Sequence, residues 1–330
     1  MALLEVTDLV VEFAGRGGPL RAVDGVSFEL NAGEILGLVG ESGSGKSVTC
    51  RAILRLLPGR GARIARGTVR YDGRNLLTLS EEEMREVRGS AISMIFQNPS
   101  SHLDPVMPIG DQVAEPLIVH EDLSKKEARR RAIELLRRVG MPDPEQQYGA
   151  YAHQLSGGLR QRAMIAAALS CRPALLIADE PTTALDVTVQ AQILRLLLKL
   201  RDKTGLSIIL ITHDLGVIAQ TADSVAVMYA GRVVERASKA DLLARPLHPY
   251  SQALIRSQPE LAKPDAPLPS IEGQPPPLDA LPAGCRFHPR CRYVAAACRE
   301  TDVRLAAVTE RRFSACLRWR ELIGAGENAP

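Results

Sequence analysis

The sequence predicts an α/β protein built on a largely parallel β-sheet, because short apolar segments alternate with helical patterns along the chain. Each predicted strand is an uninterrupted apolar run rich in β-branched residues, which is typical of strands buried on both faces. These strands are expected at residues 35–39, 92–96, 174–178, 207–211 and 224–229. Helices are expected between them, as parallel strands require crossover connections.

The chain length of 330 residues predicts about two domains. Eleven of the 22 prolines lie between Pro246 and Pro289, a density that excludes regular helix and central strand over this segment. We therefore expect a main domain over residues 1–245 and an extension over residues 246–330. Within the main domain, a helical subdomain is expected at about 98–165. Its clearest helix is 125–139, where Ser124 and Glu127 form a capping-box pattern.

Composition and charge exclude several classes of protein. Hydrophobic residues make up 45% and charged residues 24%, which excludes a disordered chain and a membrane-embedded body. The formal net charge of +3 is too small for a surface built to bind nucleic acid. No apolar run is long enough to span a membrane, and Glu5 and Asp8 stand where an export signal would be apolar. We expect a chain that reaches a membrane only through other subunits.

A phosphate-binding motif follows the first predicted strand. Residues 40–47 read GESGSGKS, which matches the P-loop pattern GxxxxGK[ST], and a helix is expected directly after it at 48–57. Glycines and the helix N-terminus present backbone N–H groups to phosphates, Lys46 adds a positive charge, and the Ser47 hydroxyl suits Mg²⁺. The expected nucleotide-binding residues here are Gly40, Ser42, Gly43, Ser44, Gly45, Lys46, Ser47 and Val48.

Two carboxylates, Asp179 and Glu180, directly follow the predicted strand 174–178. In a P-loop protein this position suits Asp179 to hold Mg²⁺ and Glu180 to polarise the attacking water. Alone the pair is a weak signal, because adjacent acids are common at surface turns. Together with the P-loop it predicts nucleotide hydrolysis.

The segment 155–162 reads LSGGLRQR, and it resembles the signature of the ATP-binding cassette (ABC) ATPases. Ser156 and the backbone N–H groups of Gly157 and Gly158 precede a predicted helix at 159–169, which makes a second anion site. Other residues resemble further family motifs in the family's order. Gln97 resembles the Q-loop glutamine, Ala184 to Asp186 the D-loop, and His213 the switch histidine.

The resemblance implies an ABC cassette with a mixed, largely parallel sheet core and a helical subdomain. It implies a head-to-tail dimer in which Ser156, Gly157 and Gly158 close over ATP held by the partner's P-loop. Lys46, Glu180, His213 and Gln97 would serve catalysis, and Ser47, Gln97 and Asp179 would hold Mg²⁺. Asp186 would contact the nucleotide site. An aromatic residue stacks on adenine in this family, and Phe13 is the nearest candidate, with a core role at a strand end as the alternative.

The C-terminal part resembles the extension found on ATPase subunits of oligopeptide and dipeptide importers, a group that includes nickel importers. The resemblance rests on Pro246-Leu247-His248-Pro249-Tyr250, the proline-rich stretch and the cysteines that follow. His248 and Tyr250 are expected to pack the extension against the cassette. The implied function is ATP hydrolysis coupled to peptide uptake at the cytoplasmic face of the inner membrane. The implied partners are two permeases, a second, related ATPase in a heterodimer, and an extracytoplasmic solute-binding protein.

Four cysteines, Cys285, Cys291, Cys298 and Cys316, lie within 32 residues. In a reducing compartment, clustered thiols are more often metal ligands than disulfides. Four thiolates suit a 4Fe-4S cluster or tetrahedral zinc, and the family resemblance favours the 4Fe-4S cluster. Nine arginines but only three acidic residues lie between Cys285 and Arg320, which we expect to offset the negative charge of such a centre.

Two rival functions remain open from the sequence. A nickel or other small-nutrient importer would share every motif, because the ATPase does not select the solute. An ABC ATPase acting on ribosomes or DNA would usually hold two cassettes, whereas this chain has one P-loop and one LSGG segment. We expect no direct nucleic-acid binding.

Overall fold

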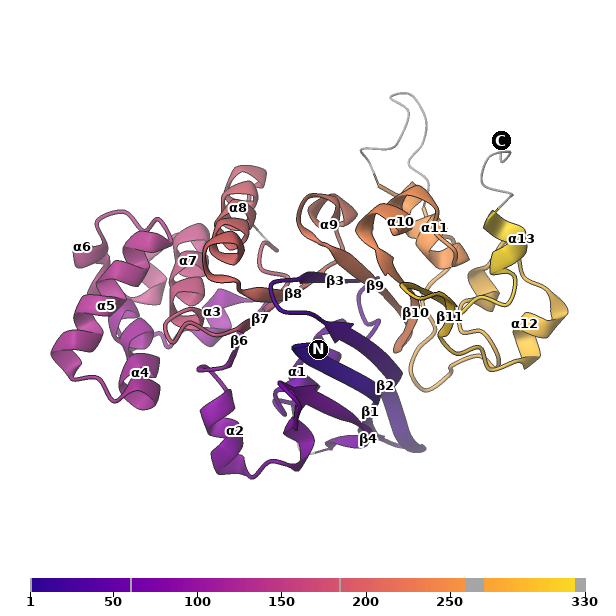
Figure 1. Ribbon diagram of the computed structural model, residues 1–330, viewed down its shortest axis with the longest axis horizontal. Helices are drawn as coiled ribbons and strands as arrows, with labels where there is room; N and C mark the ends of the chain where they lie inside the picture. Colours follow the sequence, from indigo (N-terminus) through magenta and orange to yellow (C-terminus); the bar gives the residue numbers. More distant parts are fainter. Residues whose placement is uncertain (1, 60, 184, 259–269, 324–330) are drawn as a thin grey trace. The chain divides into compact units, whose positions relative to one another are not determined.

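The computed structural model describes residues 2–59, 61–183, 185–258 and 270–323, and Figure 1 labels most of its helices and strands. These residues divide into two compact units. The first unit takes its described residues from 1–31, 35–77 and 212–330, and the second from 32–34 and 78–211. The described residues of 246–330, the segment that the sequence assigns to an extension, belong to the same unit as the N-terminal residues.

The first unit contains an antiparallel sheet in the order β2-β1-β4-β5. Its strands are β1 (Leu4–Gly15), β2 (Gly18–Leu30), β4 (Ala62–Tyr71) and β5 (Arg74–Asn75). The sequence does not predict these strands, because register shifts near Leu9 interrupt the alternation of inward and outward side chains. In addition, β1 buries a charged residue, Glu12, which pairs with Arg21 and Arg63.

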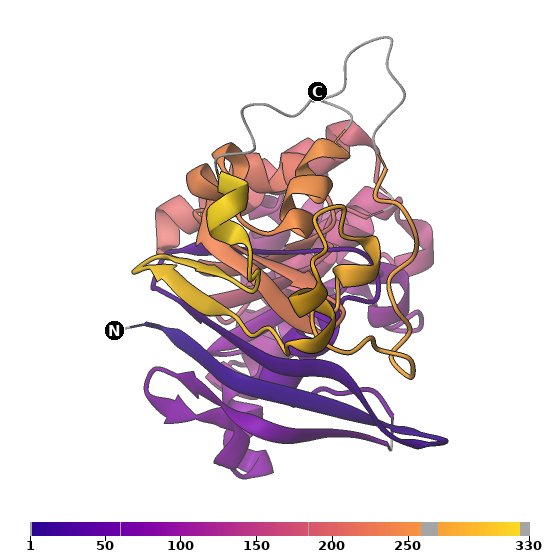
Figure 2. The same cartoon turned by 90° about the vertical axis from the view of Figure 1, so that its right-hand side faces the viewer.

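The same unit holds five strands in the order β11-β12-β10-β9-β3. They are β3 (Ile35–Val39), β9 (Ser224–Tyr229), β10 (Arg232–Ser238), β11 (Ala306–Thr309) and β12 (Arg312–Ser314). Strands β3 and β9 are parallel, and the bounds of both match the prediction. The C-terminal strand β12 extends the sheet beside β10, as the yellow and orange ribbons in Figure 2 show.

Short helices complete the first unit. They are α1 (Lys46–Ile53), α9 (Leu215–Thr221), α10 (Lys239–Ala244), α11 (Pro249–Arg256), α12 (Ala296–Glu300) and α13 (Trp319–Ile323). Helix α1 ends before the predicted limit of 57, because Arg55 adopts a left-handed φ of 55°. Helix α11 corrects the prediction that the proline-rich segment excludes helix. Pro249 occupies the first helical turn, where the missing N–H costs nothing.

The second unit contains three parallel strands in the order β8-β7-β6 and a group of helices. The strands are β6 (Ile92–Ile95), β7 (Leu175–Asp179) and β8 (Ser207–Thr212), each within one residue of its prediction. The helices are α2 (Glu81–Val87), α3 (Pro99–His102), α4 (Ile109–Glu121), α5 (Lys125–Arg138), α6 (Pro144–Tyr148), α7 (Gly157–Ala168) and α8 (Val187–Thr204).

Helix α5 begins at the predicted residue, and the Ser124 hydroxyl accepts a hydrogen bond from the Glu127 N–H at 3.3 Å, which is the N-cap half of the predicted capping box. The Glu127 carboxylate pairs with Arg130. Ala128, Ala132 and Leu136 of this helix are fully buried. Across the residues that the structure describes, none of the helices combines the length and the apolar character that crossing a lipid bilayer demands.

Candidate nucleotide-binding site

The predicted phosphate loop lies between β3 and α1, as the motif requires. Gly40, Gly43 and Gly45 have φ values of 152°, 76° and 100°, which are conformations that residues with a Cβ rarely adopt. A Cβ on Gly40 would lie 2.1 Å from the backbone oxygen of Met228. Ser42 and Gly43 are exposed, whereas Ser44 and Gly45 are buried. The loop is therefore closely packed at its two ends and open in the middle.

Lys46 begins α1 and is nearly buried, with 5% exposure. Its Nζ donates hydrogen bonds to the backbone oxygens of Gly40 at 2.7 Å and Glu41 at 2.8 Å. The ammonium group thus lies over the loop it belongs to. Ser47 and Val48 follow in the first turn of α1 and are half-buried. A helix N-terminus and a lysine on one glycine loop are features that favour anion binding.

In the second unit, Asp179 ends β7 fully buried, and Glu180 follows with a left-handed φ of 46°. Such a conformation is strained for a glutamate and is common at functional sites. The Glu180 carboxylate oxygen Oε2 accepts hydrogen bonds from the Gln97 amide at 2.9 Å and from the Thr183 hydroxyl at 2.8 Å. The structure therefore brings together Gln97 and Glu180, two of the predicted catalytic residues.

Thr183 is a site residue that the sequence reasoning missed. It stands three residues after Glu180, a spacing at which a hydroxyl in a turn can reach back to an earlier side chain. Asp186 has a local role in the structure, because its carboxylate accepts from the Val189 N–H at 2.9 Å and caps α8. Ala184, the first residue of the predicted D-loop, lies outside the described residues.

The residues of the predicted second anion site also lie at a helix N-terminus. Ser156 is exposed and caps α7, with its hydroxyl accepting from the Leu159 N–H at 3.4 Å. Gly157 and Gly158 are the first residues of α7. A Cβ on Gly158 would lie 2.9 Å from the Val189 side chain, so α8 packs closely here. The signature segment thus has an exposed serine followed by two half-buried glycines, and binding of an anion by these residues stays a prediction.

Two further predicted residues lie in the first unit. His213 is exposed between β8 and Asp214, the residue that caps α9. Phe13 is half-buried within β1, in register with Leu20 on β2 and Ala62 on β4. The nucleotide contacts of both residues stay predictions.

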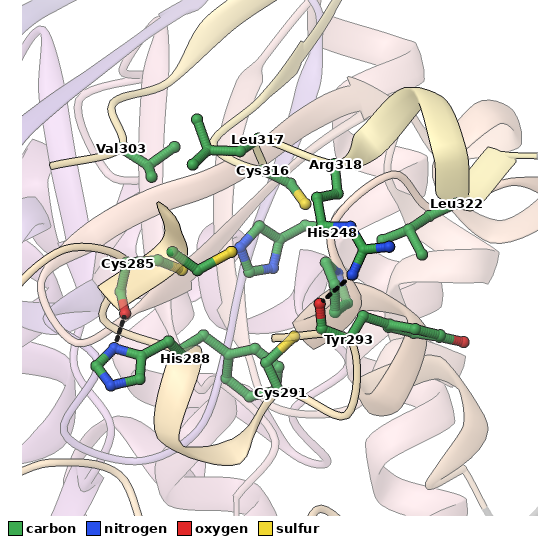
Figure 3. A pocket seen from close by; sticks show the side chains of 13 residues that line it. His248, Cys285, His288, Cys291, Tyr293, Val303, Cys316, Leu317, Arg318 and Leu322 are labelled. Carbon is green, nitrogen blue, oxygen red and sulfur yellow. Dashed lines mark hydrogen bonds between the residues drawn. The ribbon is translucent and has the colours of Figure 1, made fainter. Parts of the chain in front are cut away.

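The four C-terminal cysteines line one pocket, together with His248, Phe287 and Arg318 (Figure 3). His248 is fully enclosed, and burial lowers its pKa to about 3. Burial also raises the pKa of the Cys316 thiol to about 12. Within the described parts of the chain, no group of three or more His, Cys, Asp or Glu side chains is arranged to hold a metal ion. The four cysteines lie around one pocket, and their role as metal ligands stays a prediction.

The nearby arginines divide between two kinds of partner, because Arg318 lines the cysteine pocket, whereas others pair with carboxylates elsewhere. Arg286 binds the Asp24 carboxylate and the Ala230 carbonyl oxygen. Arg290 binds Glu41 of the phosphate loop. Arg304 also pairs with Asp24, and Arg312 pairs with Glu235. Four of the nine arginines therefore neutralise carboxylates far away in the sequence, which the local charge count could not show.

Family models and curated relatives agree on the type of protein. The family model described as "ABC transporter" matches residues 23–183. The model described as "Oligopeptide/dipeptide transporter, C-terminal region" matches residues 234–298. The chain is 51% identical to a probable peptide ABC transporter ATP-binding protein of Sinorhizobium fredii, over 97% of this chain and 96% of that protein. It is 47% identical to the dipeptide transport ATP-binding protein DppD of Haemophilus influenzae, over 94% of each chain.

Solved structures give the same assignment. The cassette MJ0796, in a dimeric post-hydrolysis state with bound ADP and phosphate, superposes with a TM-score of 0.65 at 28% identity. That match covers 72% of this chain and 98% of the cassette. With the phosphate loop, the signature helix and the matched C-terminal region all in place, this chain belongs to the ABC transporter ATP-binding proteins that carry the oligopeptide/dipeptide transporter C-terminal region.

Proposed function

We propose that this chain is the ATP-hydrolysing subunit of a peptide importer, in which it drives movements of two permease subunits. The observation that carries hydrolysis is the Glu180 carboxylate, held by Gln97 and Thr183 at the end of β7. A carboxylate fixed in this way can orient a water molecule for attack on a phosphoryl group. The C-terminal region at residues 234–298 and the names of the relatives support peptides as the cargo.

Each predicted residue has a role in this proposal. Lys46 and the loop amides of residues 42–47 bind the phosphates, and the positive charge of Lys46 offsets charge that develops on the transferring group. His213 contacts the γ-phosphate. Ser156, Gly157 and Gly158 close over the nucleotide of a second, related cassette, with Asp186 beside them. Phe13 stacks on adenine.

Mg²⁺ suits the donors that the proposal assigns to it, because magnesium prefers oxygen ligands. Ser47 offers a hydroxyl, Asp179 a carboxylate and Gln97 an amide oxygen. The hydrogen bond from Gln97 to Glu180 uses the amide nitrogen and not that oxygen. Bound Mg²⁺ neutralises phosphate charge in the transition state.

Glu180→Gln tests the hydrolytic role. We expect ATP turnover to fall by about two to four orders of magnitude, the usual contribution of a general base, while ATP binding is retained. The matched control is Glu145→Gln, because Glu145 is an exposed partner of Arg137 and lies outside the site. Unchanged turnover in Glu180→Gln would remove Glu180 from the mechanism.

Partner identification tests the transport role. The tagged chain would be purified from native membranes in mild detergent, and its stoichiometric partners identified by mass spectrometry. Two permeases, a second ATPase of this family and an extracytoplasmic peptide-binding protein are expected, which would also place the chain at the cytoplasmic face of the inner membrane. A nickel-binding protein in place of the peptide-binding protein would change the cargo. Recovery with ribosomes or DNA alone would refute transport.

The cysteine pocket is proposed to take a 4Fe-4S cluster, with zinc as the alternative. The support is that four thiols, the ligand number of either centre, line one pocket. Ligation would require the thiols to lose their protons and turn toward a common point. The test is iron, acid-labile sulfide and zinc content after anaerobic purification, compared with Cys316→Ala. Absence of all three from the wild-type protein would refute the proposal.

A further inference from the structure

An acidic residue, Glu41, stands directly after Gly40 in the loop that the proposed function assigns to the phosphates of ATP. A carboxylate at this position repels a polyanionic ligand unless its charge is neutralised. The structure shows how this happens. Arg290 binds both Glu41 carboxylate oxygens, with Nη1 to Oε2 at 2.7 Å and Nη2 to Oε1 at 3.0 Å. Such a paired contact is the strongest kind of ion pair and fixes the carboxylate orientation.

The Arg290 side chain is 4% exposed, and each of its five N–H groups has an acceptor. Besides the two bonds to Glu41, Nη1 donates to the Tyr229 hydroxyl at 3.4 Å. Nη2 donates to the Ile271 backbone oxygen at 3.2 Å, and Nε to that of Glu272 at 2.8 Å. A guanidinium held by five acceptors has one position available, so it holds Glu41 in one position as well.

The Glu41 backbone is held from the same side. Its N–H donates to the Tyr250 hydroxyl at 2.8 Å, so this amide points at a tyrosine and not into the loop. Tyr250 is fully buried and packs against Tyr229 and Phe287, with ring centroids 4.7 Å and 5.4 Å away. Phe287 and Arg290 belong to one turn, closed by a hydrogen bond from the Arg290 N–H to the Phe287 carbonyl oxygen at 3.0 Å.

We infer that Arg290 and Tyr250 are positioning residues for the phosphate loop, which hold the Glu41 carboxylate and its N–H away from the phosphates. The inference rests on the proposed function, since it takes residues 40–47 as the ATP site. Arg290 acts by neutralising and orienting Glu41, and it need not touch ATP. The C-terminal region thereby contributes to nucleotide affinity through two contacts with a single loop residue.

The test measures binding of Mg²⁺-ATP to the full chain for Glu41→Gln, Arg290→Gln and the double variant. Arg290→Gln leaves the Glu41 charge without its neutralising partner, and we expect the ATP Kd to rise about tenfold, the scale of a lost charge-assisted hydrogen bond. Adding Glu41→Gln removes that charge and should recover most of the loss. The Arg290→Gln defect should also shrink as salt rises, because added ions screen the repulsion.

Arg292→Gln is the matched control, because Arg292 is exposed, lies two residues away and contacts the Tyr293 hydroxyl. It should bind ATP as the wild type does. If Arg290→Gln binds ATP within twofold of this control, or if the double variant is no better than Arg290→Gln, the inference is wrong. A double variant that folds where Arg290→Gln does not would support it, since the unpaired carboxylate would then be the cause.

If both Arg290 variants fail to fold, Tyr250→Phe decides. It keeps the packed ring and removes the hydroxyl that accepts from Glu41, so we expect an ATP Kd about threefold higher, in line with one neutral hydrogen bond. An unchanged Kd would overturn the inference. Lys46→Ala separates the two levels of the argument. If the wild type binds no more ATP than Lys46→Ala, the proposed function fails. If the wild type binds more ATP than Lys46→Ala, and the Arg290 and Tyr250 variants bind as much as the wild type, only the inference fails.

Discussion

Replacing Asp24 with asparagine tests how much one buried carboxylate stabilises the first unit. Asp24 lies on β2 with 2% exposure. Its Oδ2 accepts from Arg232 at 2.7 Å and from Arg286, while Arg304 lies 3.6 Å away. The side chains of Arg232 and Arg286 are only 14% and 9% exposed. Asparagine keeps the shape of aspartate and removes the charge, which leaves these cations without their shared partner.

Breaking a buried ion pair by removing one partner costs about 3–5 kcal/mol. Asparagine still offers one acceptor oxygen, so we expect a loss of about 3 kcal/mol in the free energy of unfolding. The sole tryptophan, Trp319, lies in this unit and gives a fluorescence signal for it during urea titration. If the free energy of unfolding falls by about 3 kcal/mol per molar urea, the urea concentration at the unfolding midpoint of Asp24→Asn should be about 1 M lower than that of wild type.

Asp8→Asn is the control, because Asp8 also pairs with an arginine in this unit, but both side chains of the Arg66 pair are at least half exposed. Exposed pairs contribute about 0–1 kcal/mol, and asparagine tolerates the left-handed φ of 49° at this position. The midpoint of this variant should stay within about 0.3 M of wild type. Equal losses in the two variants would refute the reasoning.

The difference between wild type and Asp24→Asn should depend on pH. Burial by itself raises the pKa of the Asp24 carboxyl, but the hydrogen bond and charge of Arg232, with Arg286 and Arg304, lower it below its ordinary value. A carboxyl whose pKa is lowered by folding contributes stability above its unfolded pKa of about 3.9 and loses it as the pH falls through the folded value. The difference should therefore be constant from pH 7 to 5 and shrink below about pH 4.

The second unit supports two further predictions around Tyr148, whose ring packs against Gly110 of α4. An added Cβ at Gly110 would lie 2.1 Å from this ring, so Gly110→Ala should cost about 1–3 kcal/mol by urea titration, whereas Gly149→Ala, with no atom closer than 3.8 Å, should be neutral. Burial, and then the hydrogen bond to Asp111, raise the pKa of Tyr148 to about 12. The stabilisation by the neutral Tyr148 hydroxyl is complete below pH 10 and is lost between pH 10 and 12. The difference in free energy of unfolding between wild type and Tyr148→Phe should therefore fall in this range by up to about 1.4 kcal/mol per pH unit. A difference that stays constant with pH would contradict this prediction.

Local patterns in the sequence predicted the elements that hold the nucleotide motifs. The bounds of β3 and β9 match, and the strand–loop–helix order around Lys46 is confirmed, because both depend on runs of neighbouring residues. Local patterns do not predict the antiparallel strands β1, β2 and β4. Bulges and the buried Glu12 break the alternation of apolar and polar side chains along these strands.

Contacts between residues far apart in the sequence are a second feature that local patterns do not predict. The sequence predicts that the cysteines lie together, and they line one pocket. Proximity along the chain predicts that Arg290 lies beside them, yet it binds Glu41. Nothing in a local run of residues specifies which distant carboxylate a buried arginine will meet, and Thr183 beside Glu180 was missed because a threonine in a turn has many partners within reach.

The ion pair between Glu41 and Arg290 joins residues 249 positions apart, and that between Asp24 and Arg286 joins residues 262 positions apart. A ribosome adds about 5–20 residues per second, so roughly 12–50 s separate the synthesis of the loop from that of its supporting arginine. During that time the nascent chain carries the complete nucleotide motif without the contacts that orient it. A chain released before residue 285 would keep the motif and lack those contacts. A segment that is translated late thus supplies contacts to a loop that is translated early.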